Sequence, residues 1–286
     1  MPIITRRQNL LALMAAAVSA CSRAPAKEKP LRVVSISPNT TETMFAIGAG
    51  DALVGRSRYC DVPAEAKKLP AVGGFSDPNV EAIVALSPSL VIGGRGPAGP
   101  TLEQNLRAHG IETFFPETET IAAINTMITD LGKRVDRMAG AQRVVRDIED
   151  KHKALRTKLE GKPRVRVLFA FDIAPVIAAG PGSFTDEVLR EAGAENVVTK
   201  GGPYPTIGLE HLLTLDPDLL LDGASDMQAT KSMRERVTDA PGWKELRAVK
   251  QGRIRAVGSD ALRPGPRIGD GLWAVARAIH GDDFAP

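Results

Sequence analysis

The stretch AQRVVRDIEDKHKALRTKLE, residues 141–160, contains neither proline nor glycine and decides how the chain is organised. Its apolar residues recur at spacings of three, seven and four positions, which predicts a helix with one apolar stripe and an otherwise charged surface: Val145, Ile148, Leu155 and Leu159. A helix of this length spans about 30 Å, roughly the width of a small domain. Gly140 precedes the stretch, and residues 161–163 (GKP) end it.

Short apolar runs alternate with amphipathic segments on both sides of this helix. The runs predict strands over residues 31–36, 53–55, 90–92, 112–115, 165–171, 219–221 and 254–257. The intervening patterns predict helices, among them one capped by Thr40 or Thr41, one extending to Met138, and one over residues 243–249. Such alternation favours parallel sheets. We therefore predict an α/β fold with two Rossmann-like, mainly parallel lobes, residues 31–140 and 161–286, joined by a single long rigid helix.

The two lobes also resemble each other in sequence. Residues 81–92 (EAIVALSPSLVI) match residues 210–221 (EHLLTLDPDLLL) without a gap. Less sharply, TTE at residues 40–42 with Gly48 matches TDE at residues 185–187 with Gly193. Two matches in the same order indicate a duplication. Two facing lobes predict a ligand cleft between them.

The first 30 residues indicate export. Arg6 and Arg7 precede a short apolar run that cannot span a bilayer, which is typical of a signal peptide over residues 1–20. The sequence VSAC at residues 18–21 resembles a bacterial lipobox, which implies lipid on Cys21, a tether over residues 21–30, and a periplasmic or cell-envelope location. An ordinary signal peptide is the alternative, and the paired arginines leave twin-arginine export open.

Composition excludes several classes of function. Without residues 1–20 the chain has 35 basic and 34 acidic residues, a net charge of +1, so no basic excess points to nucleic acid. With Cys21 lipidated, Cys60 has no disulfide partner and is either a small buried residue or a ligand contact. The four histidines occur singly and are expected at the surface, so they do not form a zinc or manganese receptor site.

Several motifs carry a family resemblance. They lie at residues 37–42 (SPNTTE), 55–63 (GRSRYCDVP), 79–92, 203–205 (PYP), 259–260 (SD) and 266–268 (PRI). In this order they resemble the iron-siderophore/vitamin B12 class of ABC-transporter substrate-binding proteins, over residues 31–280. The resemblance implies a monomer that holds a small metal-chelate ligand between its lobes. It also implies delivery to an inner-membrane permease with its ATPase.

Within this class the chain is most similar to members that bind vitamin B12, and the resemblance implies the ligand-binding residues. Cleft aromatics fall on Tyr59, Phe75, Phe171 and Tyr204, and a cleft aspartate falls on Asp260. Phe75 and Tyr204 stand where those members have tryptophans, and two further aromatic positions fall on Gly94 and Ile177. Flat aromatic rings suit a planar macrocycle. We expect no intrinsic cofactor and no metal bound directly by the protein. The bound ligand is expected to be a cobalt corrinoid, or alternatively a ferric siderophore or haem whose carboxylates meet Arg95, Arg263 and Arg267.

The same residues also have structural interpretations. The aromatic side chains are equally suited to anchoring loops on their own lobe, Asp260 to forming a turn, and Arg267 to pairing with Asp270. Glu81 and Glu210 occupy the same repeat position near helix starts, where negative charge stabilises a helix. For these two the resemblance implies docking on arginines of a two-fold permease.

Two other functions compete with ligand transport. An α/β enzyme is one, but residues 93–97 (GGRGP) lack the phosphate-binding glycine pattern, and no nucleophile elbow or metalloprotease motif occurs. A lipoprotein acting as a sensor or scaffold is the other. We expect a binding protein without enzymatic activity.

Overall fold

The structure, a computed structural model, describes residues 30–95, 99–223 and 231–284. The described residues from Leu31 onward belong to one compact unit. The predicted signal peptide and Cys21 lie outside the described residues. Within the described ranges, no helix has both the length and the apolar character needed to cross a membrane.

The N-terminal lobe contains a four-stranded, wholly parallel sheet in the order β2-β1-β3-β4. Its strands are β1 (Val33–Ser35), β2 (Leu53–Arg56), β3 (Leu90–Ile92) and β4 (Glu112–Phe114). The central strands β1 and β3 are buried throughout, as expected for apolar runs covered on both faces. Helices and 3-10 turns connect them: α2 (Pro38–Ala46), η1 (Gly50–Ala52), η2 (Ala64–Lys68), α3 (Val80–Ala85) and α4 (Gly99–Ala108).

The C-terminal lobe contains a six-stranded mixed sheet. Its strands follow the order β10-β9-β5-β6-β8, and β7 also pairs with β5. They are β5 (Val165–Ile173), β6 (Val176–Ala178), β7 (Ala194–Asn196), β8 (Thr206–Ile207), β9 (Leu219–Asp222) and β10 (Ile254–Ala256). The connecting elements are α7 (Phe184–Glu191), α8 (Leu209–Leu215), α9 (Met233–Val237), η3 (Trp243–Glu245), α10 (Arg247–Lys250) and η4 (Ser259–Leu262).

Three strands of this sheet were not predicted from the sequence. β6 forms an antiparallel hairpin with β5, and β8 pairs antiparallel with β6. These strands have only two or three residues, which is too few to show a period of two. The helix predicted over residues 243–249 is also divided, into η3 and α10. The prediction of two α/β lobes is confirmed, with a mixed rather than mainly parallel second sheet.

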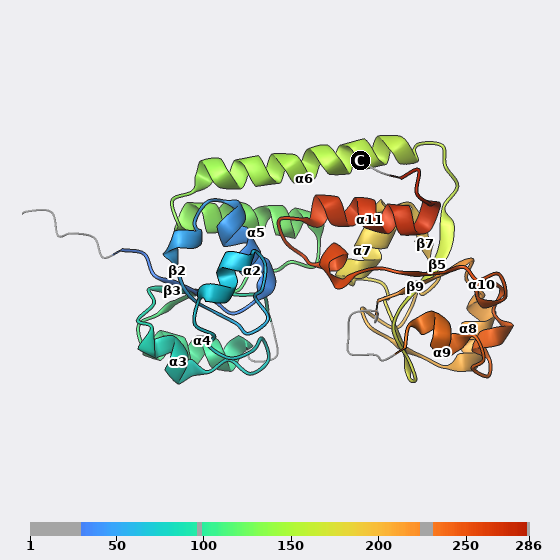
Figure 1. The fold of residues 1–286 in the computed structure, drawn as a ribbon, viewed down its shortest axis with the longest axis horizontal. Helices are drawn as coiled ribbons and strands as arrows, with labels where there is room; N and C mark the ends of the chain where they lie inside the picture. Colours follow the sequence, from blue (N-terminus) through green and yellow to red (C-terminus); the bar gives the residue numbers. More distant parts are fainter. Residues whose placement is uncertain (1–29, 96–98, 224–230, 285–286) are drawn as a thin grey trace, which may run out of the picture. The chain divides into compact units, whose positions relative to one another are not determined.

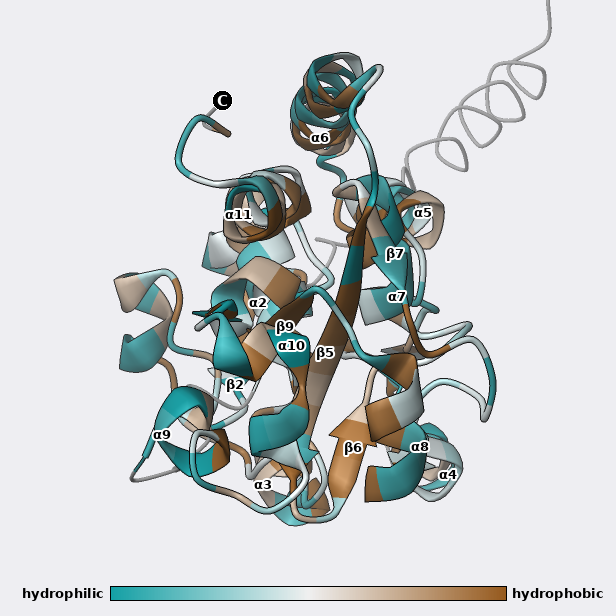
Figure 2. Ribbon diagram, turned by 90° about the vertical axis from the view of Figure 1, so that its right-hand side faces the viewer, coloured by the Kyte–Doolittle hydropathy of each residue, from teal (hydrophilic) through white to brown (hydrophobic). Residues whose placement is uncertain are grey.

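A single continuous helix, α6 (Met138–Leu159), runs over both lobes (Figure 1). It packs against α5 (Ile121–Arg134) and against α11 (Ile268–His280). The buried residues of α6 form one stripe: Gly140, Ala141, Ile148 and Leu155. Figure 2 shows α6 above α5 and α11, and the apolar strands β5 and β6 below them.

The start of α6 differs from the prediction. The helix begins at Met138, so Gly140 lies inside its first turn and does not precede it, and α5 ends at Arg134. The physical reason is a close approach between α6 and the end of α2: a Cβ atom at position 140 would overlap the carbonyl oxygen of Ile47. Glycine therefore marks a helix contact here and not a helix boundary.

The predicted cap of α2 was also wrong. Ser37 is the N-cap residue, and Pro38 occupies the first helical turn. Thr40 and Thr41 are fully buried inside the helix, where their hydroxyl groups bond Ser35. A proline in the first turn is the stronger signal, because its missing N–H costs nothing there.

Local geometry agrees with the predicted repeat. Glu81 and Glu210 both lie in the first turn of their helices, α3 and α8. The two repeats then turn at the same position, where Ser87 and Asp216 each have a positive φ, 49° and 35°. Each of these residues precedes a proline, which disfavours the right-handed helical conformation and ends the helix.

The hydrophobic core continues from one lobe to the other under α6. One buried cluster includes Val33 and Met44 of the N-terminal lobe and Val167 and Phe169 of the C-terminal lobe. Ile148, near the middle of α6, belongs to the same cluster and is fully buried. The two lobes therefore share a core through the helices α5, α6 and α11.

We predict that Gly140→Ala lowers the free energy of unfolding by about 1–3 kcal/mol, because the added methyl group overlaps the backbone of Ile47 and neither backbone can move easily. Urea denaturation followed by circular dichroism measures this change. Gln142→Ala, an exposed position in the same helix, is the matched control and should change stability by less than about 0.5 kcal/mol. Equal stability of the two variants would show that α6 does not depend on this contact.

Candidate functional site: the interlobe cavity

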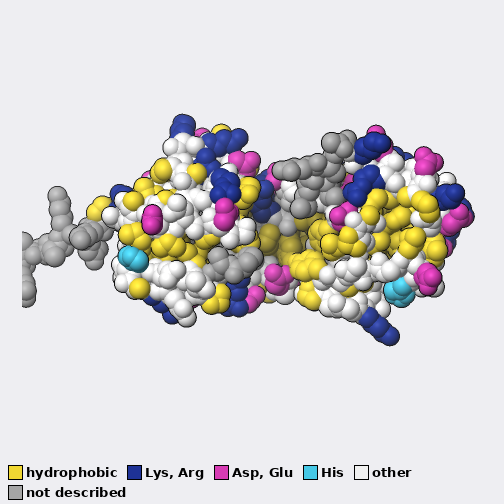
Figure 3. Space-filling view, turned by 90° about the horizontal axis from the view of Figure 1, so that it is seen from below, with side chains coloured by type: hydrophobic (Ala, Val, Ile, Leu, Met, Phe, Trp, Pro, Cys, Tyr) yellow, Lys and Arg dark blue, Asp and Glu magenta, His cyan; other side chains and the backbone are white. Residues whose placement is uncertain are grey.

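A cavity of about 310 Å³ lies between the two halves of the chain. Figure 3 shows this face of the protein hollowed between the lobes, with hydrophobic side chains in the hollow. Most of its lining comes from loops at the carboxyl ends of strands β1, β3 and β4, and residues 263–264 contribute from the C-terminal half. The lining residues are Ser37, Pro38, Asn39, Phe75, Gly94, Arg95, Pro116, Glu117, Thr118, Glu119, Arg263 and Pro264.

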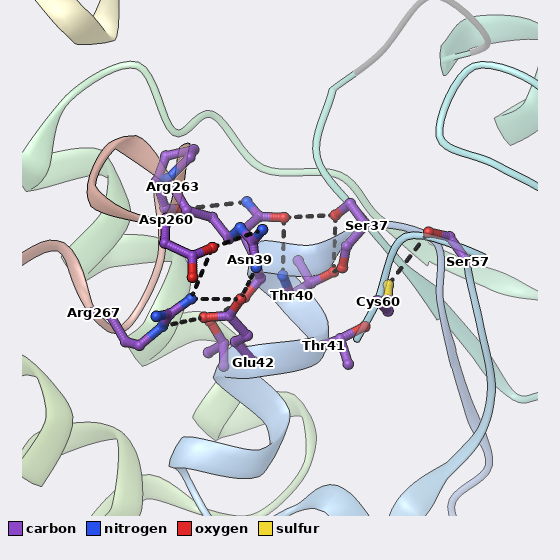
Figure 4. Close-up of polar contacts among 12 residues, drawn as sticks. Ser37, Asn39, Thr40, Thr41, Glu42, Ser57, Cys60, Asp260, Arg263 and Arg267 are labelled. Atoms are coloured by element: carbon purple, nitrogen blue, oxygen red, sulfur yellow. Dashed lines mark hydrogen bonds and ion pairs between the residues drawn. The ribbon is translucent and has the colours of Figure 1, made fainter. Parts of the chain in front are cut away.

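A polar network forms one wall of this cavity. The hydroxyl group of Ser37 donates to Asn39 Oδ1 at 2.6 Å and accepts from the backbone N–H of Gly94 at 2.8 Å (Figure 4). Asn39 Nδ2 donates to the carbonyl oxygen of Pro264 at 3.3 Å, which joins the N-terminal lobe to the C-terminal half. These bonds hold the start of α2 and the loop after β3 in fixed positions beside the cavity.

A buried ion-pair cluster lies next to this wall. Glu42 of α2 is 4% exposed, and its carboxylate accepts from Arg267 Nε at 2.8 Å, from Arg267 Nη2 at 3.2 Å, and from Arg263 Nη1. Asp260 lies 3.1 Å from Arg263 Nη2 and 3.5 Å from Arg267 Nη2. The hydrogen bonds to Glu42 raise the pKa of Arg267 above its ordinary value. Two carboxylates thus balance two guanidinium groups (Figure 4).

Arg95 is paired as well. Its guanidinium forms an ion pair with Glu117, and its Nε donates to the carbonyl oxygen of Phe115 at 3.3 Å. Each arginine predicted to meet a ligand carboxylate, Arg95, Arg263 and Arg267, therefore has a carboxylate partner within the protein.

Two predicted aromatic residues belong to the N-terminal lobe. Phe75 lines the cavity, beside Gly94. Tyr59 is 54% exposed and lies close to Gly74, directly before Phe75. The guanidinium of Arg58 lies 5.6 Å from the Tyr59 ring centre and is held by Asp77 at 2.7 Å.

The other two predicted aromatic residues belong to the C-terminal lobe. Phe171, in β5, and Tyr204 pack edge to face with ring centres 5.7 Å apart, and Phe169 continues the row at 5.0 Å. Tyr204 is also 54% exposed. Burial of its hydroxyl end, and secondly the negative charge of Glu119, raise the pKa of Tyr204. Glu119 belongs to the N-terminal half and lines the cavity. Its charge therefore affects a tyrosine of the other lobe.

The predicted residues differ in their relation to the cavity. Phe75, Gly94, Arg95 and Arg263 line it directly. Asp260 does not line the cavity but pairs with Arg263, which does. Arg267 is linked to Arg263 by their shared partner Glu42. The remaining predicted positions, Tyr59, Phe171, Tyr204 and Ile177, are outside its lining.

A second cavity, of about 510 Å³, lies between α2, α6 and the start of α11. Its apolar lining includes Phe45, Val144 and Pro266. Of the residues predicted to bind ligand, only Arg267 lines it, together with Glu42. The ion-pair cluster therefore joins residues of two different cavities.

Cys60 and the histidines make no metal site in the part of the chain that the structure describes, where no group of three His, Cys, Asp or Glu side chains is placed to hold an ion. Cys60 is fully buried against Ser57, which fits its interpretation as a small buried residue. His109 and His211 are exposed as expected, whereas His152 and His280 are partly buried. His152 bonds Glu191, and His280 bonds the carbonyl oxygen of Ala192, so both have structural roles.

Glu81 and Glu210 are both exposed, away from the cavity lining. Beside Glu210, α8 also exposes Leu209 and Leu213. Within the described ranges, these two leucines, Tyr59 and Tyr204 are the large hydrophobic side chains with the greatest exposure.

Besides the predicted Asp260, further acidic residues lie near these arginines or in the cavity lining. Glu42, Glu117 and Glu119 were not among the predicted site residues, although Glu42 lies in the motif at residues 37–42. One signal was available: a glutamate in the middle of the otherwise apolar and hydroxyl-bearing helix α2 is expected to be buried, and a buried carboxylate needs a cationic partner.

Comparisons with known proteins agree with this geometry. A sequence profile of the periplasmic binding protein family matches residues 33–261. The vitamin B12-binding protein of Vibrio parahaemolyticus is 31% identical over 247 residues, which cover 85% of this chain and 86% of that protein. The vitamin B12-binding protein of Salmonella typhimurium is 32% identical over 191 residues, 66% of this chain and 71% of that protein.

Solved structures extend the comparison to the fold. The periplasmic vitamin B12-binding protein BtuF of Vibrio cholerae superposes with a TM-score of 0.74 at 28% identity, over 87% of this chain and 96% of that chain. The periplasmic haem-binding protein HutB of Vibrio cholerae gives 0.75 at 26% identity, over 87% and 97%. All four proteins are binding proteins and not enzymes. The chain belongs to the periplasmic binding protein family, within the iron-siderophore and vitamin B12 class of ABC-transporter substrate-binding proteins.

Proposed function

We propose that the chain is the substrate-binding subunit of an ABC importer and carries a cobalt corrinoid in the interlobe cleft. In this proposal it is exported, anchored by lipid on Cys21, and acts as a monomer in the cell envelope. It releases its ligand to an inner-membrane permease driven by an ATPase.

The observation that carries this proposal is the pairing of the cleft arginines. A corrinoid such as cyanocobalamin is neutral overall and offers amides and a flat macrocycle. Phe75 lines the cavity, and in this proposal Tyr59, Phe171 and Tyr204 join it in giving flat apolar contact to the ligand. The guanidinium groups of Arg95, Arg263 and Arg267 are already neutralised by protein carboxylates. A neutral planar ligand therefore suits the cleft better than an anionic one.

Haem is the alternative ligand, and one observation keeps it as the second candidate: Tyr59 is a half-exposed phenol close to Gly74, which directly precedes the cavity residue Phe75. A tyrosine binds ferric haem as a phenolate. Tyr204 is the other half-exposed tyrosine, and its raised pKa makes it less suited than an ordinary tyrosine to act as a phenolate ligand. A ferric siderophore that carries free carboxylates, like haem, needs cationic partners for its charge, and the arginines meet this need only after leaving their carboxylates.

Glu81 and Glu210 are proposed to dock the protein on the permease. Each lies exposed in the first turn of the equivalent helix of its repeat. A duplicated protein with one acidic residue per lobe suits a two-fold symmetric partner that carries arginines.

We expect cyanocobalamin to bind one to one, and Tyr59→Ala and Tyr204→Ala each to weaken binding about three- to tenfold through lost ring contact. Isothermal titration of the soluble form starting at Ser22 measures this. Leu213→Ala, which removes an equally large exposed apolar side chain outside the cavity, is the control and should not change affinity. Binding of haem or a ferric siderophore in place of cyanocobalamin would contradict the choice of ligand but not the transport class.

Gly94→Trp should strengthen corrinoid binding by about threefold or more, because it adds an aromatic ring at the cavity wall. A Cβ atom at position 94 has Phe75, Ser37 and Asn39 at 3.6–3.9 Å, which is ordinary contact distance. Gly208→Trp is the matched control, since its Cβ meets no atom within 4 Å and it lies outside the cavity lining. If both variants change cyanocobalamin affinity equally in titration, the position is not a ligand contact.

Charge reversal at the docking positions should separate transport from binding. Glu81→Arg and Glu210→Arg are each expected to reduce uptake at least about tenfold, because like charges face each other across the interface, while titration with ligand stays unchanged. Uptake is measured in cells or in vesicles that contain the cognate permease and ATPase. Glu149→Arg, at an exposed position of α6, is the control. Full uptake by the variant that carries both charge reversals would show that neither residue belongs to the docking surface.

A further inference from the structure

Glu42 is 4% exposed and pairs with Arg263, which lines the interlobe cavity. It lies on α2, which packs against strand β1 and helix α6. Its partners come from sequence positions 221 and 225 residues further on. Its carboxylate therefore reaches from one lobe to residues 263–267 of the other half.

Glu42 and its partners have no spare positive charge. Arg267 binds both oxygens of the carboxylate, and Arg263 binds one of them from the side. Asp260 forms ion pairs with both guanidinium groups. The side chain of Arg263 is only 19% exposed, although Arg263 lines the cavity. The cationic group in this wall is thus covered by two anions.

A second arginine of the cavity lining is also paired with a carboxylate. Arg95 is paired with Glu117, and Glu119 adds a further negative charge to the lining. A carboxylate entering the cavity meets arginines that are already paired, and it meets acidic side chains as well. A neutral ligand encounters neither obstacle, because its amide groups form hydrogen bonds without needing a countercharge.

We propose that Glu42 is a specificity-determining residue: by holding Arg263 and Arg267 it keeps the cavity wall charge-neutral, so that neutral chelates bind in preference to carboxylated ones. This inference rests on the proposed function, since it concerns the choice of ligand at the same site. Removing the charge of Glu42 leaves Asp260 as the single anion for two guanidinium groups. The amide group of a glutamine also brings N–H donors against them, so Arg263 turns toward the cavity.

The duplication supplies a matched control at Glu187. This residue occupies the equivalent repeat position on α7 and also reaches the other lobe, where it accepts from the backbone N–H of Ile121 at 3.0 Å. Its partner is a neutral backbone group, and Glu187 does not line the cavity. Glu187→Gln removes the same charge and keeps an oxygen to accept this bond, without freeing a cavity arginine.

The test compares cyanocobalamin, its monocarboxylate made by hydrolysing one side-chain amide, and haemin. Glu42→Gln should bind the monocarboxylate and haemin at least about tenfold more tightly than the wild type, as expected for a new charge-assisted hydrogen bond. Affinity for cyanocobalamin should change by less than about threefold. The gain should shrink in high salt because it is electrostatic. Glu42→Gln/Arg263→Gln should lose the gain, and Glu187→Gln should never show it.

Two results would overturn the inference: equal behaviour of Glu42→Gln and Glu187→Gln, or an equal gain for neutral and carboxylated ligands. Circular dichroism checks that Glu42→Gln is folded. If it is not, Asp260→Asn replaces it, since the Asp260 side chain is more than half exposed and its loss also uncovers Arg263. Asp260→Asn should then bind the carboxylated ligands more tightly than the wild type, by a smaller factor than that expected for Glu42→Gln. If Asp260→Asn shows no increase in affinity for these ligands, the inference is overturned.

The proposed function fails separately. A wild-type protein that ignores cyanocobalamin but binds haemin contradicts the corrinoid proposal. The ratio of haemin affinities between Glu42→Gln and the wild type still reports the role of Glu42 in that case.

Discussion

The structure depends on the contact between one helix and both lobes. The buried stripe of α6 packs on α5 with its first half and on α11 with its second half, which joins the hydrophobic core of the two lobes. Sharing this core requires the close approach at Gly140, where α6 meets the backbone of α2. Because α6 is continuous and both lobes are fixed on it, the cavity between them is largely formed by the fold itself.

Two glutamates from the sequence repeat add polar contacts to this shared core. Glu42 binds Arg267 at the N-terminus of α11, and Glu187 binds the N-terminus of α5 at Ile121. Both are buried or partly buried, and both cross from one half of the chain to the other. The duplicated position has thus kept its structural role in each lobe. Among the described residues, Glu42 is the one of these two glutamates that forms ion pairs with arginines, so this copy affects the charge of the cavity.

The chemistry of the cavity follows from this pairing. Arginines near a ligand are normally evidence for an anionic ligand, because guanidinium groups bind carboxylates in a bidentate manner. Here protein carboxylates occupy those guanidinium groups. Burial, and secondly the charge of Glu119, raise the pKa of Tyr204 above its ordinary value. In the proposed function, the aromatic rings supply the remaining contacts to the ligand. The same residue types thus favour a different ligand once their partners are known.

The sequence by itself determined most of the elements and their order. The stripe spacing predicted the long helix, buried apolar runs predicted β1, β3 and β9, and the matching repeats indicated that α3 with β3 is equivalent to α8 with β9. These features depend on neighbouring residues, so local periodicity and turn chemistry record them. Only the tertiary structure decided the antiparallel strands β6 and β8, the start of α6, and the pairing of Glu42 with Arg263 and Arg267. Those features join positions far apart in the chain, and their energies come from packing and charge burial that no local pattern contains.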